Sequence, residues 1–394
     1  MRDVLDDLLP WWRAGHPVAV ATVVATWRSA PRQAGASMAV GPGGEAVGSV
    51  SGGCVEGAVY ELAQQVGDTG EPVLTRYGVS DDDAYAVGLT CGGILDVFVE
   101  VVSPATFPEL ELVAADIAAH RPVAVATLVA HPEAGRVGAR LVIRTEDHGT
   151  TVSSGSLGGA RLNHAVLDDA RGLLALGRTE TLNYGPDGER RGEGSRVFVT
   201  SYAPAPRMII FGAIDFAAAL STMGAFLGYR VTVCDARPVF ATHARFRDAD
   251  EVVVDWPHRY LAAEVAAGRV DERSVLAVLT HDPKFDVPLL ELALRLPRVG
   301  FVGAMGSRLA HEDRMTRLRE AGLTAVELER LSSPIGLDLG ARTPQETAVS
   351  IAAEIVALSW GGQGRRLSAT DGPIHHHGAT HAVAVPDLAA QTTA

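Results

Sequence analysis

The chain has 394 residues, of which 47% are hydrophobic and 21% charged, and its formal net charge is −13. Such a length and composition predict a globular protein of two or three domains. The negative charge argues against binding to nucleic acid or to an anionic membrane surface, because both favour positive charge. No apolar run approaches the roughly 18 residues of a membrane span, the acidic N-terminus does not resemble a signal peptide, and the three cysteines are too few for a disulfide framework. We therefore expect a cytoplasmic protein.

After a predicted amphipathic helix at 1–12, the chain repeats itself. Three strand patterns occur twice in the same order: 18–24 with 123–129, 35–40 with 138–143, and 97–99 with 197–199. Chance similarity between apolar strands is the alternative, but an ordered series favours an internal duplication covering about 17–102 and 122–204. We predict that the two α+β halves form one domain over residues 1–204.

The first repeat carries a loop of particular chemical interest, Ser51-Gly52-Gly53-Cys54. Paired glycines allow a backbone conformation that most residues resist, and from Val55 the apolar residues recur at helical spacing. The segment therefore predicts a loop that leads into a helix, with Cys54 in the first turn. Unpaired amides and the helix dipole would favour a thiolate there. The alternative is a small buried cysteine in a tight turn.

Neither cysteine of the first repeat has a counterpart in the second. Cys54 is matched by Ala160 or Arg161, and Cys91 lies in a segment that only the first repeat contains. A cysteine needed only for the shared framework would have no reason to occur in one copy alone. We therefore predict a chemical role for Cys54, for the neighbouring Glu56 and for Cys91, and a scaffold role for the second copy.

A Pro-rich stretch at 202–206 marks the predicted domain boundary, and from 205 to 362 buried strands alternate with helices. Strands are predicted at 208–211, 230–234, 251–254, 275–279 and 299–302, and helices are centred on 217–227, 261–267, 288–296 and 309–321. This alternation is typical of a parallel sheet. The predicted fold class is α/β, with an N-terminal duplicated α+β unit followed by a C-terminal Rossmann-like domain. The polar residues 363–394 predict a disordered tail.

The turn after the first strand of this domain matches the dinucleotide fingerprint only in part. Gly212 is present, but Ile214 replaces the second glycine, and Asp215 puts a negative charge where a pyrophosphate would lie. Asp235 ends the next strand, where a ribose-binding acid belongs. Gly212 and Asp235 are therefore candidate cofactor contacts, whereas Ile214 and Asp215 disfavour NAD(P).

Two other helix starts suit an anion better. The first is a loop that contains Gly303, Gly306, Ser307 and Arg308. It combines flexible backbone with a hydroxyl and a guanidinium at a helix N-terminus. At the second, Arg342 precedes a predicted capping box with Thr343 as N-cap and Glu346 at the third helical position. Helix capping without any ligand is the alternative at both places.

Several of these motifs resemble the XdhC/CoxI family, the xanthine dehydrogenase accessory proteins. The matching segments are 48–56, 77–81, 88–93, 253–257, 279–284, 302–308 and 335–344. The resemblance implies a chaperone that binds molybdenum cofactor (molybdopterin), supports its sulfuration, and helps insert it into a molybdenum hydroxylase of the xanthine dehydrogenase or CO dehydrogenase type. The implied partners are that apo hydroxylase and a cysteine desulfurase as sulfur donor, and a homodimer stays open. The family commonly has His where this chain has Asp215.

The resemblance implies that the chain is an accessory factor and not an independent enzyme. Cys54 would offer a soft thiolate to molybdenum, Ser51, Gly52 and Gly53 would form the loop around the cofactor, and the two helix starts would suit its phosphate. Two alternatives stay open. One is an NAD(P)-dependent oxidoreductase with a redox-active Cys54, and the other is a maturation scaffold that binds no cofactor.

Overall fold

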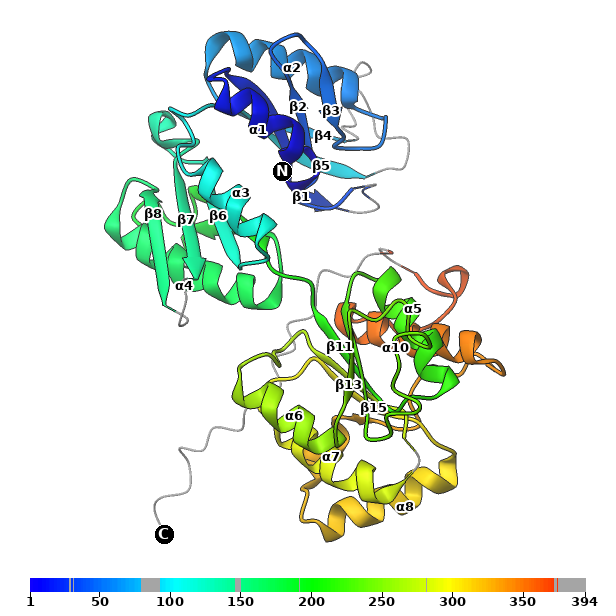
Figure 1. Ribbon diagram of the computed structural model, residues 1–394. Coiled ribbons are helices and arrows are strands. Elements are labelled where there is room, and N and C mark those ends of the chain that lie inside the picture. The colour runs from blue at the N-terminus through cyan, green and yellow to red at the C-terminus, as the bar shows by residue number, and fades with distance from the viewer. Residues whose placement is uncertain are drawn as a thin grey trace, which may run out of the picture. The chain divides into compact units, whose positions relative to one another are not determined.

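A computed structural model describes residues 1–27, 30, 32–78, 93–145, 150–190, 192–280, 282–371 and 374 (Figure 1). Cys91 and the histidine-containing tail from residue 375 lie outside the described residues. The chain divides into two compact units, Met1–Ala205 and Pro206–Ala394. Antiparallel sheets in the first unit and a parallel sheet in the second confirm the predicted α/β class. None of the helices in the described part of the chain combines the length and hydrophobicity of a membrane span.

Within its described residues, the first unit contains two five-stranded sheets with the same strand order. The first sheet has the order β3-β2-β1-β5-β4 and the second has the order β8-β7-β6-β10-β9. The strands of the first are β1 (Val18–Trp27), β2 (Ser37–Val40), β3 (Ala46–Gly48), β4 (Val73–Tyr77) and β5 (Ile94–Val102). Those of the second are β6 (Val123–Ala130), β7 (Arg140–Thr145), β8 (Thr151–Ser156), β9 (Glu180–Tyr184) and β10 (Ser195–Tyr202). Adding five to each strand number of the first sheet gives the order of the second, so the two sheets have the same topology.

A long helix covers one face of each sheet. The helices of this unit are η1 (Arg2–Val4), α1 (Leu5–Arg13), α2 (Glu56–Thr69), α3 (Leu110–Ala118), η2 (Ala134–Arg136) and α4 (Ala160–Leu176). α2 buries Val59, Ala63 and Val66, which recur at helical spacing, against β1 and β5. α4 packs in the same way on β6 and β10. Each copy therefore has its own hydrophobic core.

A buried ion pair connects the two copies. Glu100 on β5 and Arg140 on β7 are both buried and form this pair. The Arg140 guanidinium also lies 4.5 Å from the ring centroid of Phe107. Burial raises the pKa of the Glu100 carboxyl, and the charge of Arg140 opposes that shift. The pair links a strand of one sheet to a strand of the other.

The second unit is built on a six-stranded parallel sheet with the order β13-β12-β11-β14-β15-β16. Its strands are β11 (Arg207–Phe211), β12 (Arg230–Asp235), β13 (Glu251–Val254), β14 (Val275–Val278), β15 (Phe301–Ala304) and β16 (Leu331–Ser332). The chain order reverses between β11 and β14, as it does in doubly wound Rossmann sheets. Ligands in such sheets bind outside the carboxyl ends of the strands, so the loops that follow the strands are the ones to inspect.

Helices cover both faces of this sheet (Figure 1). They are α5 (Asp215–Phe226), α6 (Pro257–Ala266), α7 (Pro283–Arg295), α8 (Arg308–Glu320), α9 (Ala325–Glu329), α10 (Pro344–Trp360) and η3 (Leu367–Ala369). α5 and α10 pack together over one hydrophobic core, and α6 and α7 pack together over another. The two cores lie on opposite faces of the sheet, because successive side chains of a strand alternate between the faces.

The predicted elements of this unit differ most from the structure at β15 and α7. β15 begins at Phe301 and not at 299, because the amides of Gly300 and Phe301 both turn to the carbonyl of Ser274. α7 spans Pro283–Arg295, so its centre lies earlier in the chain than the expected 288–296. The carboxylate of Asp282 caps this helix by accepting the Lys284 amide at 3.1 Å, and proline is well suited to the first helical position. Pro288 therefore lies inside the helix.

Candidate functional site

Cys54 lies in a tight loop between β3 and α2. Gly52 and Gly53 have φ values of 77° and 123°, the left-handed region that the glycine pair predicts. The Cys54 and Val55 amides both donate to the Ser51 hydroxyl at 3.0 Å. Ser51 and Val55 are buried, whereas Cys54 is only partly buried. The loop therefore holds a partly buried thiol, packed against the hydrophobic core of the first repeat, on a backbone that is held by hydrogen bonds.

The helix after this loop starts later than predicted. α2 begins at Glu56 with Val55 as its N-cap, so Cys54 precedes the helix and does not lie in its first turn. The Glu56 carboxylate reaches back over the loop. Its Oε1 accepts from the Ser49 hydroxyl at 2.7 Å and the Ser51 amide at 2.9 Å, and its Oε2 accepts from the Gly53 amide at 2.8 Å. These contacts make Glu56 a positioning residue for the loop, and its catalytic role stays a prediction.

The hydrogen bonds to Glu56 set its ionisation. Burial by itself would raise the pKa, but the hydrogen bonds from Ser51 and Ser49 outweigh burial and lower the pKa of Glu56 to about 2. A folded pKa below the ordinary value of 4.5 means that the ionised carboxylate stabilises the fold at neutral pH. This contribution is lost as the pH falls from about 4.5 towards about 2.

Glu56→Gln should therefore lower the free energy of unfolding at pH 7 by about 1–2 kcal/mol, because a neutral amide replaces an acceptor of charge-assisted hydrogen bonds. It should also reduce the loss of stability between pH 4.5 and pH 3. Urea unfolding at pH 7, 4.5 and 3 measures both effects. Glu61→Gln, an exposed position on the same helix, is the matched control. Identical pH profiles for Glu56→Gln and the wild type would contradict the assignment.

The second repeat contains a loop of the same construction. Gly48 and Gly155 have φ values of 77° and 82°. A Cβ at either glycine would lie 2.3 or 2.5 Å from the carbonyl oxygen of Ser37 or Arg140 on the neighbouring strand. The two glycines are therefore equivalent in structure as well as in sequence, and they define the register between the two loops.

In this register Arg161 is the counterpart of Cys54, and Asn163 is the counterpart of Glu56. Asn163 Oδ1 accepts the Leu157 amide at 2.8 Å, and its Nδ2 donates to the Ser156 hydroxyl at 3.1 Å. The second loop is thus held by a neutral amide, whereas the first is held by a carboxylate and carries the thiol. The comparison resolves the choice between Ala160 and Arg161 that the sequence left open.

In the second unit, the turn after β11 is held by a buried acid. Gly212 has φ 112°, and a Cβ there would lie 3.0 Å from the Thr280 amide nitrogen. Asp235 Oδ2 accepts the Ala213 amide at 2.7 Å, and Oδ1 accepts the Arg237 Nε at 2.9 Å. Burial opposes ionisation, but the hydrogen bonds from Arg237 and Ala213 outweigh it and lower the pKa of Asp235. Asp235 therefore stabilises the turn, and its role in ribose binding stays a prediction.

Asp215, predicted to repel an anion at this turn, has a cationic partner. Its Oδ1 accepts from Arg245 Nη2 at 3.1 Å, and Arg245 Nη1 donates to the Ala213 carbonyl at 3.2 Å. Arg245 follows a different strand, so no local pattern in the sequence indicates this pair. Because the pair is close to neutral, charge repulsion at the turn is weaker than the sequence predicts.

Asp215→Asn should leave the Arg245 guanidinium available to a phosphate. We expect NADPH to bind about three- to tenfold more tightly to this variant, with the largest gain at low salt, where exposed charges are least screened. Fluorescence titration with NADPH over a range of ionic strength measures the effect. Asp248→Asn removes another exposed carboxylate of the same unit and serves as the control. Unchanged affinity at every salt concentration would show that this turn is not a dinucleotide site.

The predicted anion loop after β15 divides into two parts with different roles. Gly303 is buried in β15, and a Cβ there would lie 2.5 Å from the Ile335 side chain, so this glycine makes room for packing. Gly306, with φ 157°, leads into α8. Ser307 is the N-cap of α8 and accepts the Ala310 amide at 3.1 Å, and Arg308 is exposed. The hydroxyl and the guanidinium therefore lie at a helix start, as predicted.

The helix start after Arg342 is capped by the chain itself. The predicted capping box is confirmed: Thr343 Oγ1 accepts the Glu346 amide at 3.2 Å, and Glu346 Oε2 accepts the Thr343 amide at 3.0 Å. Glu346 also accepts the Arg342 amide at 2.8 Å. These amides are the donors that a bound anion would need. Phosphate binding by Arg342 would therefore depend on its exposed side chain, and it stays a prediction.

Comparison with known proteins identifies the family. A family model described as the XdhC Rossmann domain matches residues 208–355, and a model described as the XdhC and CoxI family matches residues 11–78 and 116–185. The chain belongs to the XdhC and CoxI family. The resemblance drawn from the motifs is confirmed, and the second match includes parts of both repeats.

Relatives of this XdhC/CoxI protein match it over most of their length. It is 27% identical to a protein of Bacillus subtilis (strain 168) named as a probable xanthine dehydrogenase subunit, over 86% of this chain and 92% of the relative. It is 23% identical to the molybdenum cofactor insertion chaperone PaoD of Escherichia coli (strain K12), over 88% and 84%. A crystal structure described as a xanthine dehydrogenase from Bacillus halodurans aligns with a TM-score of 0.61 and 25% identity, covering 93% of this chain and 97% of that one.

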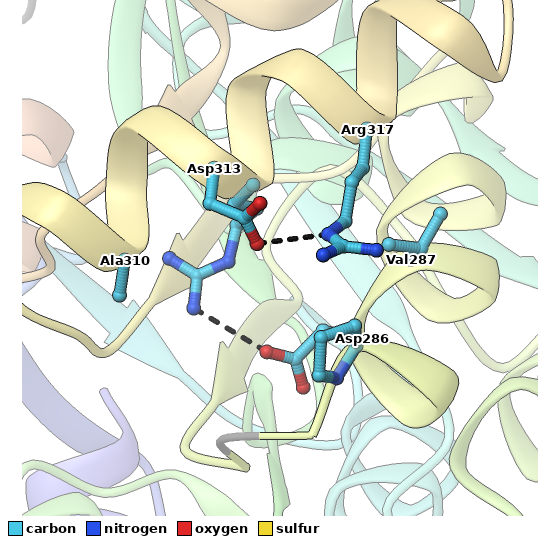
Figure 2. A pocket seen from close by; sticks show the side chains of 7 residues that line it. Asp286, Val287, Ala310, Asp313 and Arg317 are labelled. Atoms are coloured by element: carbon cyan, nitrogen blue, oxygen red, sulfur yellow. Dashed lines mark hydrogen bonds and ion pairs between the residues drawn. The ribbon is translucent and has the colours of Figure 1, made fainter.

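The XdhC-type motifs of the second unit meet at a buried ion pair that no sequence motif indicated. Arg314 on α8 and Asp286 on α7 are both buried, and Arg314 Nη2 lies 3.3 Å from Asp286 Oδ2 (Figure 2). Arg314 also donates to the Met305 carbonyl at 2.7 Å and to the Ser333 hydroxyl at 2.9 Å. The Thr280 hydroxyl donates to Asp286. The pair therefore joins the loops after β14, β15 and β16.

A small pocket of mixed polar and apolar lining opens beside this pair, between α7 and α8 (Figure 2). Asp313 and Arg317 line it from α8 and form an exposed ion pair at 2.8 Å. Two arginines and two carboxylates balance each other here, so the pocket has no marked preference for an anion. The signal that could have revealed Arg314 is its position four residues before Leu318, on the face of α8 that is buried. That signal does not predict the partner.

Proposed function

We propose that this protein binds molybdenum cofactor, supports its sulfuration and helps insert it into an apo molybdenum hydroxylase of the xanthine dehydrogenase type, with a cysteine desulfurase as sulfur donor. Support comes from membership of the XdhC and CoxI family and from the similarity to PaoD, which is named a molybdenum cofactor insertion chaperone. The relatives span both units, so the proposal concerns the whole chain.

The observation that carries the proposal is the Cys54 loop. A partly buried thiol occurs in the first repeat, and the second repeat has Arg161 at the equivalent position of the register, in the first turn of α4. A soft thiolate is a suitable ligand for a thiophilic metal. The described residues contain no cluster of three metal-binding side chains. Cys54 would therefore act as a single anchor for a metal that arrives with the ligands of its own cofactor.

The surrounding residues have supporting roles in this proposal. Ser51 and Glu56 hold the loop, and Gly52 and Gly53 leave space for a ligand close to the backbone because they have no side chains. When bound, the cofactor would supply the molybdenum, and the chain would orient it through Cys54. Ser307 and Arg308 in the second unit are proposed as contacts for a phosphate.

The test is reconstitution of an apo molybdenum hydroxylase with molybdenum cofactor, with and without this protein. We expect hydroxylase activity to appear faster with the protein present. We also expect the protein purified from a cofactor-producing host to carry molybdenum and pterin in equal amounts, measured by mass spectrometry and by pterin fluorescence after release. Purified protein that contains neither, and that gains neither on titration, would favour the cofactor-free scaffold instead.

A further inference from the structure

The solvent side of α10 carries an apolar stripe in addition to the buried face that packs over the sheet. The apolar residues of the buried face are Ala348, Ile351, Ala352 and Ile355. The stripe consists of Val349, Ala353, Val356 and Trp360, and its two valines and its tryptophan are 46%, 44% and 57% exposed. A helix that is apolar on both sides is normally buried on both sides. The stripe therefore indicates a surface that another element covers.

The charges of α10 and of its neighbour α5 lie away from this stripe. The two charged residues of α10 are Glu346, which caps the helix, and Glu354, whose Oε2 accepts the Gly336 amide at 2.7 Å. α5 packs beside α10 (Figure 1) and has one charged residue, Asp215, in its first turn. Its last residue, Phe226, is 83% exposed. The stripe and the rest of α5 thus form an uncharged surface in a chain whose net charge is −13.

The spacing of the stripe is that of a seam between two helices. Its members are separated by four, three and four residues, as at the a and d positions of a heptad repeat. Side chains at this spacing pack into the holes of a facing helix, so a helix fits the stripe better than a sheet or a loop does. Gly361, with φ 73°, ends α10 directly after Trp360 and fixes the end of the seam.

The stripe is complementary to itself when two copies of α10 lie antiparallel. About a two-fold axis between positions 354 and 355, Val349 would face the partner's Trp360, and Ala353 would face the partner's Val356. Each pair combines a larger side chain with a smaller one. A two-fold interface uses the same surface of both copies, so it requires this kind of self-complementarity. Because the stripe carries no charge, two acidic chains can approach here with the least repulsion.

The size of this surface is sufficient for a reversible dimer. α10 has 17 residues and is therefore about 25 Å long. Together with α5 it offers a face about 20 Å wide, so two copies would bury on the order of 1,000 Å² in total. This area is close to the lower limit of specific protein–protein interfaces. We therefore expect the two copies to associate reversibly, at micromolar concentration.

We propose that α10 packs against α10 of a second copy of this chain, antiparallel about a two-fold axis, with α5 at the border of the interface. The partner is thus an identical helix and not an unrelated protein. This inference goes beyond the proposed cofactor function and does not depend on it.

The test is sedimentation equilibrium of the full chain. We expect the wild type to have the mass of two chains at micromolar concentration. Val356→Glu puts an unpaired charge into the seam and should raise the dissociation constant of the dimer at least about tenfold. Val326→Glu is the matched control, since Val326 is 63% exposed on α9, and it should associate as the wild type does. Thermal unfolding of each variant verifies that it is folded.

An exchange of charges tests the antiparallel register. Val349→Lys and Trp360→Glu should each weaken the dimer. The double variant should associate at least about threefold more tightly than Trp360→Glu alone, because each introduced lysine would face an introduced glutamate of the second copy. In a parallel pair the introduced charges would face their own kind, and the double variant would be the weakest of the three.

The proposal is overturned if the wild type has the mass of one chain at every concentration, or if Val356→Glu associates as tightly as the wild type. A one-chain mass together with binding to the apo hydroxylase that Val356→Glu abolishes would assign the surface to the hydroxylase instead. A double variant that associates no better than Trp360→Glu would reject the antiparallel pairing.

Discussion

Cys54→Ser is expected to weaken binding of molybdenum cofactor by at least about tenfold and to slow its transfer to the apo hydroxylase to a similar degree. The substitution keeps the size and polarity of the side chain but replaces soft sulfur with hard oxygen, which is a poorer ligand for this metal. The fold should be little affected, because the loop is held by Ser51 and Glu56. Anaerobic titration with the cofactor measures the affinity, and the unfolding temperature should change by less than about 2 °C.

The duplication offers a matched control for this substitution. Arg161→Ser changes the equivalent position of the second repeat, in the first turn of α4, where the side chain is exposed and its contact with Glu189 is 3.5 Å long. We expect this variant to bind the cofactor as the wild type does. Wild-type affinity in Cys54→Ser would remove the thiol from the proposed mechanism. An equal loss in both variants would assign the effect to the general structure of the unit and not to sulfur.

Asp286→Ala is expected to lower the free energy of unfolding by about 3–5 kcal/mol, because it leaves the Arg314 guanidinium buried without its carboxylate. Both side chains are only 6% exposed. Since Arg314 also holds the Met305 carbonyl and the Ser333 hydroxyl, the loops after β15 and β16 should loosen together. Urea unfolding followed by circular dichroism measures the loss, and amide hydrogen exchange measures the loosening.

The neighbouring exposed pair is the control for burial. Asp313→Ala removes the partner of Arg317 at the mouth of the same pocket, and it should cost less than about 1 kcal/mol because both charges remain in water. The double variant Asp286→Leu with Arg314→Met should recover much of the stability, since an apolar pair can replace a buried ion pair. A loss for Asp286→Ala as small as that for Asp313→Ala would contradict the importance of the buried pair.

Local features of this chain were determined by short stretches of sequence. The Thr343–Glu346 capping box and the left-handed glycines of the Cys54 loop form as predicted. Both depend on backbone groups within one turn, so a few residues contain all the information that they need. The parallel sheet was predictable for a related reason, since buried strands that alternate with helices have few other ways to bury their apolar residues.

The start of α2 was placed wrongly for an equally local reason. Helical spacing from Val55 predicted Cys54 in the first turn, but the amides of Cys54 and Val55 donate to the Ser51 hydroxyl and the Glu56 carboxylate reaches back over the loop, so the helix begins at Glu56. When the first residue of a helix reaches back over the preceding loop, the spacing of apolar residues does not reveal it. The hydrogen bonds of Glu56 also show that it positions the loop, whereas its place near Cys54 in the sequence had predicted a catalytic role.

The contacts that define the carboxyl edge of the second unit were decided only by tertiary structure. Asp215 pairs with Arg245, 30 residues away, and Asp286 pairs with Arg314, 28 residues away. Trp256 meets Phe285 across an intervening helix and strand. Each contact joins loops that become neighbours because the chain crosses over the sheet between parallel strands. Sequence determined where the strands, caps and glycine turns lie, but the distance between two side chains on different loops depends on strand order and helix packing, which no local pattern specifies.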